Sequence, residues 1–155
     1  MDSLLAIDLG LRTGLALYGN NGRLIWYRSS NFGSPARLKR GVHGILKDLP
    51  GLRHIVLEGG GPLAEIWRRE ALKRDLALRR ISAEDWRPLL LHSREQRTGP
   101  LAKASADDLA RRVIHWSGAR RPTSLRHDAA EAILIGLWGV IDCGWLEELP
   151  AELKR

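Results

Sequence analysis

The sequence predicts an α/β fold in which one mixed, five-stranded sheet carries helices on both faces. The first 28 residues contain three short apolar segments separated by turn residues, which is typical of an antiparallel β-meander. After them, strand-like and helix-like segments alternate, and two long helical segments follow. Strands joined by tight turns run antiparallel, whereas strands joined through helices run parallel, so the two halves together predict a mixed sheet.

The meander is expected to consist of strands at residues 3–9, 15–18 and 23–28. Residues 10–14 contain two glycines and form the first turn. Asn21-Gly22 predicts a tight hairpin whose two central residues both adopt positive φ.

The remaining elements follow from apolar periodicity and from the residues that start and stop helices. Pro35 opens a helix that ends before Pro50, and Ser82 with Asp85 resembles a capping box. Residues 92–99 are polar and are expected to form a loop. The expected strands are residues 54–57 and 77–81, and the expected helices are residues 35–47, 63–76, 86–90, 100–116 and 126–141.

Length and composition indicate one globular domain, which we place at residues 1–142 with a C-terminal tail at 143–155. The chain has 155 residues and 44% hydrophobic content, which is enough for one core. The lone Cys143 is expected to be a packing residue in a reducing compartment. No apolar run is long enough to span a membrane, so we expect a cytoplasmic or nucleoid-associated protein.

The charge balance favours a polyanionic partner. Lys and Arg total 25 against 18 Asp and Glu, a net charge of +7. Each phosphate that a Lys or Arg neutralises releases a condensed counterion, which favours nucleic-acid binding. A soluble basic protein with no role in nucleic-acid binding remains the alternative.

Four acidic residues stand where a carboxylate is costly without a partner. Asp8 lies within an apolar strand, and Glu58 ends another one. Asp128 and Glu131 are three residues apart among alanines, so they share one face of the last helix.

Each of these acids also has a purely structural interpretation. In that interpretation, Asp8 accepts hydrogen bonds from the turn after it, and Glu58 caps the next helix. Asp128 and Glu131 then only stabilise the positive N-terminal end of their helix. Taken together, however, four carboxylates repel one another unless a cation lies among them. Their oxygen atoms suit Mg²⁺, with Mn²⁺ as a substitute. Two such ions about 4 Å apart are a common arrangement for phosphodiester cleavage.

Three motifs resemble the RNase H-like superfamily, and most of all its RuvC-type Holliday-junction resolvases. They are Ala6-Ile7-Asp8-Leu9-Gly10, Val56-Leu57-Glu58 and His127-Asp128-Ala129-Ala130-Glu131-Ala132, in the family's order over about residues 3–141. The resemblance implies that Asp8, Glu58, Asp128 and Glu131 are catalytic residues that bind two Mg²⁺ ions. Glu131 stands where the family more often has Asp.

The resemblance also implies a role for the segment from Trp86 to Lys103, where lysines of the family contact the cleaved strand. Arg87 and Lys103 match best, and Lys103 is assigned a catalytic role in stabilising developing charge. Other cations are expected to contact phosphates without reading sequence. The expected nucleic-acid-binding residues are Arg12, Arg68, Arg69, Lys73, Arg87, Lys103 and Arg121.

The loop after Glu58 departs from the family pattern. Resolvases often place an aromatic side chain there, whereas this chain has Gly59-Gly60-Gly61-Pro62-Leu63, and its nearest aromatic is Trp67. The substrate assignment is weakened by this difference more than the metal site is.

The resemblance predicts a Mg²⁺-dependent endonuclease that makes paired symmetric nicks in branched DNA (a Holliday junction) as a homodimer. One alternative is an RNase H-like nuclease that processes ribosomal-RNA precursors, and another is an inactive module that binds branched nucleic acid. A sugar-kinase or actin-like fold also has an Asp-Leu-Gly loop followed by Thr and Gly, but it needs two domains.

Overall fold

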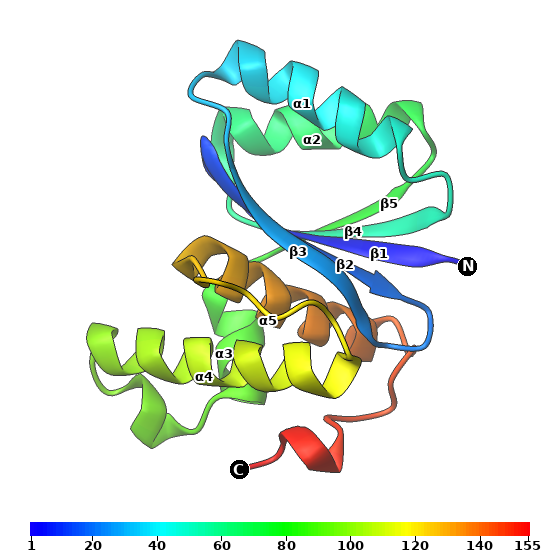
Figure 1. The fold of residues 1–155 in the computed structure, drawn as a ribbon. Helices are drawn as coiled ribbons and strands as arrows, with labels where there is room; N and C mark the ends of the chain where they lie inside the picture. The colour runs from blue at the N-terminus through cyan, green and yellow to red at the C-terminus, as the bar shows by residue number, and fades with distance from the viewer.

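The computed structural model describes residues 1–155 and contains one five-stranded sheet with the strand order β3-β2-β1-β4-β5 (Figure 1). The three strands of the meander pair antiparallel, and β4 and β5 continue the sheet in parallel with β1. This confirms the predicted mixed sheet. The strands are β1 (Ser3–Asp8), β2 (Arg12–Gly19), β3 (Leu24–Asn31), β4 (Leu52–Glu58) and β5 (Ala77–Ile81).

Helices cover both faces of the sheet, as predicted. In Figure 1, α1 and α2 lie above the sheet, and α3, α4 and α5 lie below it. None of them is both long and apolar enough to cross a membrane. The helices are α1 (Pro35–Lys47), α2 (Gly61–Lys73), α3 (Ala83–Leu90), α4 (Gly99–Ser117) and α5 (His127–Asp142), with the short 3-10 helices η1 (Ser93–Gln96) and η2 (Ala151–Leu153).

Several element boundaries differ from the sequence-based expectation. Strand β2 begins at Arg12, inside the segment expected to be a turn, because antiparallel pairing with β3 extends to Asn31. Helix α2 begins two residues early and ends at Lys73 rather than at residue 76, and Asp75 beyond it has a φ of 55°. The expected loop at 92–99 contains η1.

The hairpin prediction was wrong in its turn type. Only Gly22 has positive φ (80°), and Asn21 does not. The Gly22 amide donates to the Gly19 carbonyl (3.0 Å), and the Gly19 amide donates to the Arg23 carbonyl (3.0 Å). The turn is therefore longer, with one left-handed glycine at its end.

Alternation along the strands divides the apolar side chains between two cores. Leu5 and Ile7 of β1 face α1 and α2, whereas Leu4 and Ala6 face α3, α4 and α5. Because side chains alternate, Asp8 continues the row of Leu4 and Ala6 on the α5 side.

Helix α5 lies very close to the sheet because glycines replace side chains where the two meet. A Cβ on Gly14 of β2 would lie 1.9 Å from the Asp128 carbonyl oxygen, which is an impossible distance. Within α5, a Cβ on Gly136 would lie 2.2 Å from the Tyr18 ring, and the Tyr18 hydroxyl donates to the Ile133 carbonyl. These close approaches fix the height of α5 above the strands.

The C-terminal residues pack on the same side as α4. Leu153 of η2 is buried in the core beneath α4 and α5. The Arg155 guanidinium donates to the Glu95 carboxylate (2.7 Å) and to the Leu90 carbonyl (3.2 Å), so the last residue contacts the α3–η1 segment.

Candidate metal and nucleic-acid site

One row of residues crosses all five strands and forms the floor of the candidate site. The strand registers pair Ser29 with Gly14, Gly14 with Asp8, Asp8 with Glu58, and Glu58 with Ile81. Directly opposed residues in a sheet share one face, so this row lies on the α5 side. The two strand carboxylates, predicted from separate motifs, are therefore immediate neighbours.

The first two turns of α5 bring the other two carboxylates above this row. Because Gly14 has no side chain, the backbone at Asp128 can lie directly over β2, one strand away from Asp8. Glu131 is one helical turn further along, and its side chain is almost fully buried. The structure thus brings together all four acids that the sequence singled out.

Electrostatic repulsion among these acids is visible at Asp8. Burial raises the pKa of Asp8 to about 8, and the charges of Glu58, Glu131 and Asp128 act in the same direction. Burial also raises the pKa of Glu131, while His127 and Arg87 oppose that shift. The protein alone does not compensate the charge that four ionised carboxylates would create.

Each of the other three carboxylates has a protein partner that fixes its orientation. The Trp86 indole N–H donates to Glu58 Oε1 (2.7 Å), and the Ser29 hydroxyl donates to Asp128 Oδ2 (2.8 Å). Glu131 Oε1 lies 3.0 Å from His127 Nε2 and 3.5 Å from the Arg87 guanidinium. Its other oxygen, Oε2, is buried with no hydrogen-bond partner.

These residues fit a divalent cation by their chemistry. A buried carboxylate oxygen without a partner and a carboxylate with a raised pKa both indicate missing positive charge, and oxygen ligands suit Mg²⁺. No three or more of the His, Cys, Asp and Glu side chains already converge as a set of metal ligands, and the carboxylates instead point toward their protein donors. Metal binding would require rotation of these side chains.

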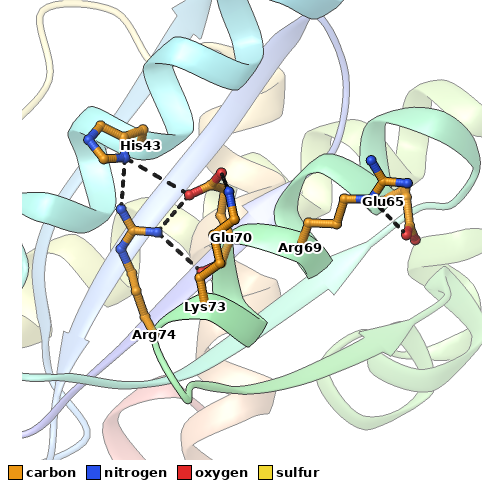
Figure 2. Close-up of polar contacts among 6 residues, drawn as sticks. All are labelled: His43, Glu65, Arg69, Glu70, Lys73 and Arg74. Carbon is orange, nitrogen blue, oxygen red and sulfur yellow. Dashed lines mark hydrogen bonds and ion pairs between the residues drawn. The ribbon is translucent and has the colours of Figure 1, made fainter.

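The expected phosphate-binding cations of α2 lie on the other face of the sheet and are paired with acids. Arg68 and Arg69 both contact the Glu65 carboxylate, at 2.5 and 3.3 Å. Lys73 contacts the buried Glu70 at 3.3 Å, and Arg74 contacts it at 2.6 Å (Figure 2). Glu65 and Glu70 therefore offset two of these four positive charges within one or two turns.

A second group of arginines has no such partners. A cavity of about 490 Å³ lies between β3 and the loop that precedes α5. No acidic side chain lines it, and none of its arginines forms an ion pair with an acid. We call it the arginine pocket, after its lining residues Arg28, Arg120, Arg121 and Arg126.

The other residues that were expected to bind nucleic acid lie at separate places in the structure. Arg87 lies at the site, beside Glu131. Lys103 is exposed near the start of α4 and makes no ion pair with any of the four acids, and Arg12 is exposed at the start of β2. Arg121 lies in the arginine pocket.

Sequence reasoning missed three residues that hold the site together. Ser29 contacts Asp128 from 99 positions away, which only the strand pairing reveals. Gly14 was assigned to a turn, although its role is to admit α5. Trp86 is fully buried, and its hydrogen bond to Glu58 was not foreseen.

No model of a known protein family matches the chain, and no curated protein matches it in sequence. In fold it is similar to T. thermophilus RuvC, solved in complex with a Holliday junction substrate. That likeness has a TM-score of 0.66 at 14% identity, and it covers 93% of this chain and 96% of that chain. Because one fold hosts many functions, a similarity at this sequence identity establishes the fold alone. The chain therefore has the RNase H-like fold that RuvC also adopts.

Proposed function

We propose that the protein is a metal-dependent endonuclease that resolves four-way DNA junctions by paired, symmetric nicks. The observation that carries the proposal is the placement of Glu58, Glu131 and Asp128 around Asp8, with negative charge that the protein leaves partly uncompensated. The fold supports the same function, because the similar RuvC structure holds a Holliday junction substrate.

The four carboxylates are the proposed ligands of two Mg²⁺ ions, which Mn²⁺ could replace. When bound, such ions lower the pKa of a water molecule and stabilise the attacking and leaving oxygens of the phosphodiester. Cleavage then needs little from the protein beyond holding the carboxylates and the strand in place.

The chain's own residues orient the proposed ligands. Trp86 donates to Oε1 of Glu58, and Ser29 donates to Oδ2 of Asp128, whose Oδ1 accepts from the Ala129 amide (2.8 Å). These donors fix the direction in which the two carboxylates present their remaining lone pairs. His127 and Arg87 partly neutralise Glu131. Lys103, which no acid engages, is proposed to contact the cleaved strand and stabilise developing negative charge.

We further propose that the active form is a homodimer. Two symmetric cuts in a four-way junction require two active sites, and a two-fold dimer supplies them. Helices α2 and α4 are the long surface helices available for the contact. Leu72 on α2 is 71% exposed, which marks this helix as one candidate.

A nicking assay tests this function. The substrates are a synthetic four-way junction, linear duplex DNA, an RNA–DNA hybrid and RNA, each with and without Mg²⁺. We expect paired nicks in the junction only when Mg²⁺ is present. Asp8→Asn should slow cleavage at least about a hundredfold while junction binding persists, since metal-ion stabilisation amounts to several kcal/mol.

The matched control is Asp107→Asn, which removes an exposed carboxylate paired with Arg111 on α4 and should leave the rate unchanged. Cleavage of RNA with no action on the junction would replace the substrate assignment with RNA processing. Binding without cleavage by the unmutated protein would show an inactive binding module instead.

A further inference from the structure

The arginine pocket lies directly beside the carboxylate row. Ser29 and Ala129 line the pocket, and the same Ser29 donates its hydroxyl hydrogen bond to Asp128. Arg126, also in the pocket, immediately precedes α5 and stands two residues before Asp128. A strand that passes over the four carboxylates would therefore reach this pocket next.

The pocket is organised before any ligand binds. The Tyr27 hydroxyl donates to the Arg120 carbonyl (2.5 Å) and thereby ties the loop before α5 to β3. The loop that carries Arg120, Arg121 and Arg126 is thus fixed against the α5 side of the strand. Arg28 pairs with Leu15, so its side chain lies on the α1–α2 side, where the guanidinium stacks on the Trp26 ring (4.5 Å to its centroid).

The backbone of β3 adds donors that no other strand uses. β3 is an edge strand, and the Phe32 amide donates to the Leu11 carbonyl. That bond sets the alternation of the β2–β3 ladder, so the amides of Tyr27 and Ser29 face away from β2, toward the open edge. The carbonyls of the same two residues also face the open edge, so the excess of donors comes from the guanidinium groups of the loop, with the hydroxyls of Thr123 and Ser124 beside them.

Cations without anions call for an anionic ligand. Guanidinium groups bind phosphate oxygens in bidentate fashion, and main-chain amides add contacts that do not depend on base sequence. We infer that the arginine pocket binds a backbone phosphate of the DNA strand held at the carboxylates, near the phosphate to be cut. The inference rests on the proposed function and names the subsite that sets the position of the strand.

An open edge strand can also accept a peptide by strand addition, but the charges argue against it here. A peptide strand brings carbonyls and amides in equal number and no net charge, whereas this edge is flanked by Arg120, Arg121 and Arg126 and by no acid. Positively charged side chains along an edge also discourage pairing with another strand.

The test maps single phosphates onto single side chains. Backbone phosphates of a synthetic four-way junction are replaced one at a time by neutral methylphosphonates. The dissociation constant for each modified junction and each protein is then measured without divalent ions. The proteins are the unmutated chain, Arg120→Ala+Arg121→Ala, and the control Arg53→Ala+Arg112→Ala. The control removes the same charge from two exposed arginines that pair with Asp2 and Asp108. Thermal unfolding confirms that each variant is folded.

We expect the pocket variant to bind the intact junction roughly ten- to a hundredfold more weakly, since each charged hydrogen bond that is removed is worth about tenfold. The control should change binding by less than about threefold. One or two methylphosphonate positions should weaken binding by the unmutated protein but have no further effect on the pocket variant, because the partner is already gone.

Equal sensitivity of both proteins at every position would overturn the pocket, as would equal weakening by the control. Binding of an extended peptide with no phosphate dependence at Arg120 and Arg121 would assign the edge to a protein partner and would overturn it too. If one methylphosphonate position loses its effect in the pocket variant but the protein never cuts the junction, the phosphate subsite stands and the nuclease function is rejected. If the protein cuts the junction but no position loses its effect, the nuclease function stands and the subsite is rejected.

Discussion

The two faces of the sheet organise their charges in opposite ways. On the α1–α2 face, acids and bases mix: Glu65 pairs with two arginines, and the buried Glu70 pairs with Lys73 and Arg74. On the α5 face, like charges gather. Asp8 lies among three other carboxylates, and the arginine pocket contains no acid.

The difference separates charges that stabilise the fold from charges that await a ligand. Mixed charges satisfy one another and contribute modestly to stability. Segregated charges raise the free energy of the folded chain and are compensated only from outside, by cations at the acids and by anions at the arginines. The number of basic residues in a segment is therefore a poor guide to where a polyanion binds.

The largest expected effect concerns how closely helices approach each face. Gly14→Ala should lower the free energy of unfolding by about 3 kcal/mol, because its Cβ would overlap the Asp128 carbonyl of α5. Gly44→Ala in α1 is the matched control. No atom lies within 4 Å of its added Cβ, so it should raise stability by about 0.5–1 kcal/mol. Denaturant unfolding measures both, and equal effects would contradict the close approach of α5.

The second test compares one acid from each face in metal-free protein at pH 8. Asp8 has a raised pKa, so its contribution to stability is full below its unfolded pKa near 4 and is lost as pH rises through about 8. Asp8→Asn should therefore raise the free energy of unfolding by about 1–3 kcal/mol at pH 8 and flatten its dependence on pH. Mg²⁺ should stabilise the unmutated protein but not this variant.

Glu70→Gln should act with the opposite sign. The hydrogen bond from Arg74 lowers the pKa of Glu70, so its contribution is present above its unfolded pKa and is lost as pH falls. The substitution should lower the free energy of unfolding by about 1–2 kcal/mol at pH 8. If both substitutions destabilised the metal-free protein equally, the contrast between the faces would fail.

The smallest expected effect is on the salt dependence of junction binding. Removing Arg120 and Arg121 should reduce the slope of log affinity against log salt by about one to two, roughly one unit for each phosphate that the protein no longer neutralises. Arg68→Ala+Arg69→Ala on α2 should change the slope less, because both side chains pair with Glu65, whose single charge offsets one of their two positive charges. A larger change for the α2 pair would restore the sequence-based assignment of that helix to phosphate binding.

Local patterns were sufficient to predict the sheet and the four acids. Period-two alternation placed Asp8 in a buried strand, and the three-residue spacing placed Asp128 and Glu131 on one helical face, because both features depend on neighbouring residues. The Glu65–Arg68 and Glu70–Arg74 spacings were equally local. They could have warned that the cations of α2 are already paired.

Features that depend on chain topology were not visible in the sequence. The hydrogen bond from Ser29 to Asp128 exists because β3 pairs with β2 and α5 crosses above both. The arginine pocket likewise joins residues 25–29 to residues 120–126 and 129. The three arginines among residues 120–126 mark a basic loop in the sequence, but only the fold shows that this loop lies against β3. Hairpin geometry was missed for another reason: Asn21-Gly22 suits a two-residue turn, but pairing of Gly19 with Arg23 closed a longer one.

The position of Ser29 on an edge strand gives the four carboxylates unequal mobility. Asp8 and Glu58 lie on adjacent central strands, whose hydrogen bonds open only in large-scale unfolding. Asp128, in contrast, is held by a strand with one free side, and such strands fray at low cost. Ordering of that edge by a bound DNA strand would then steady Asp128 at the moment when it is needed, so substrate binding and assembly of the metal site would be energetically coupled.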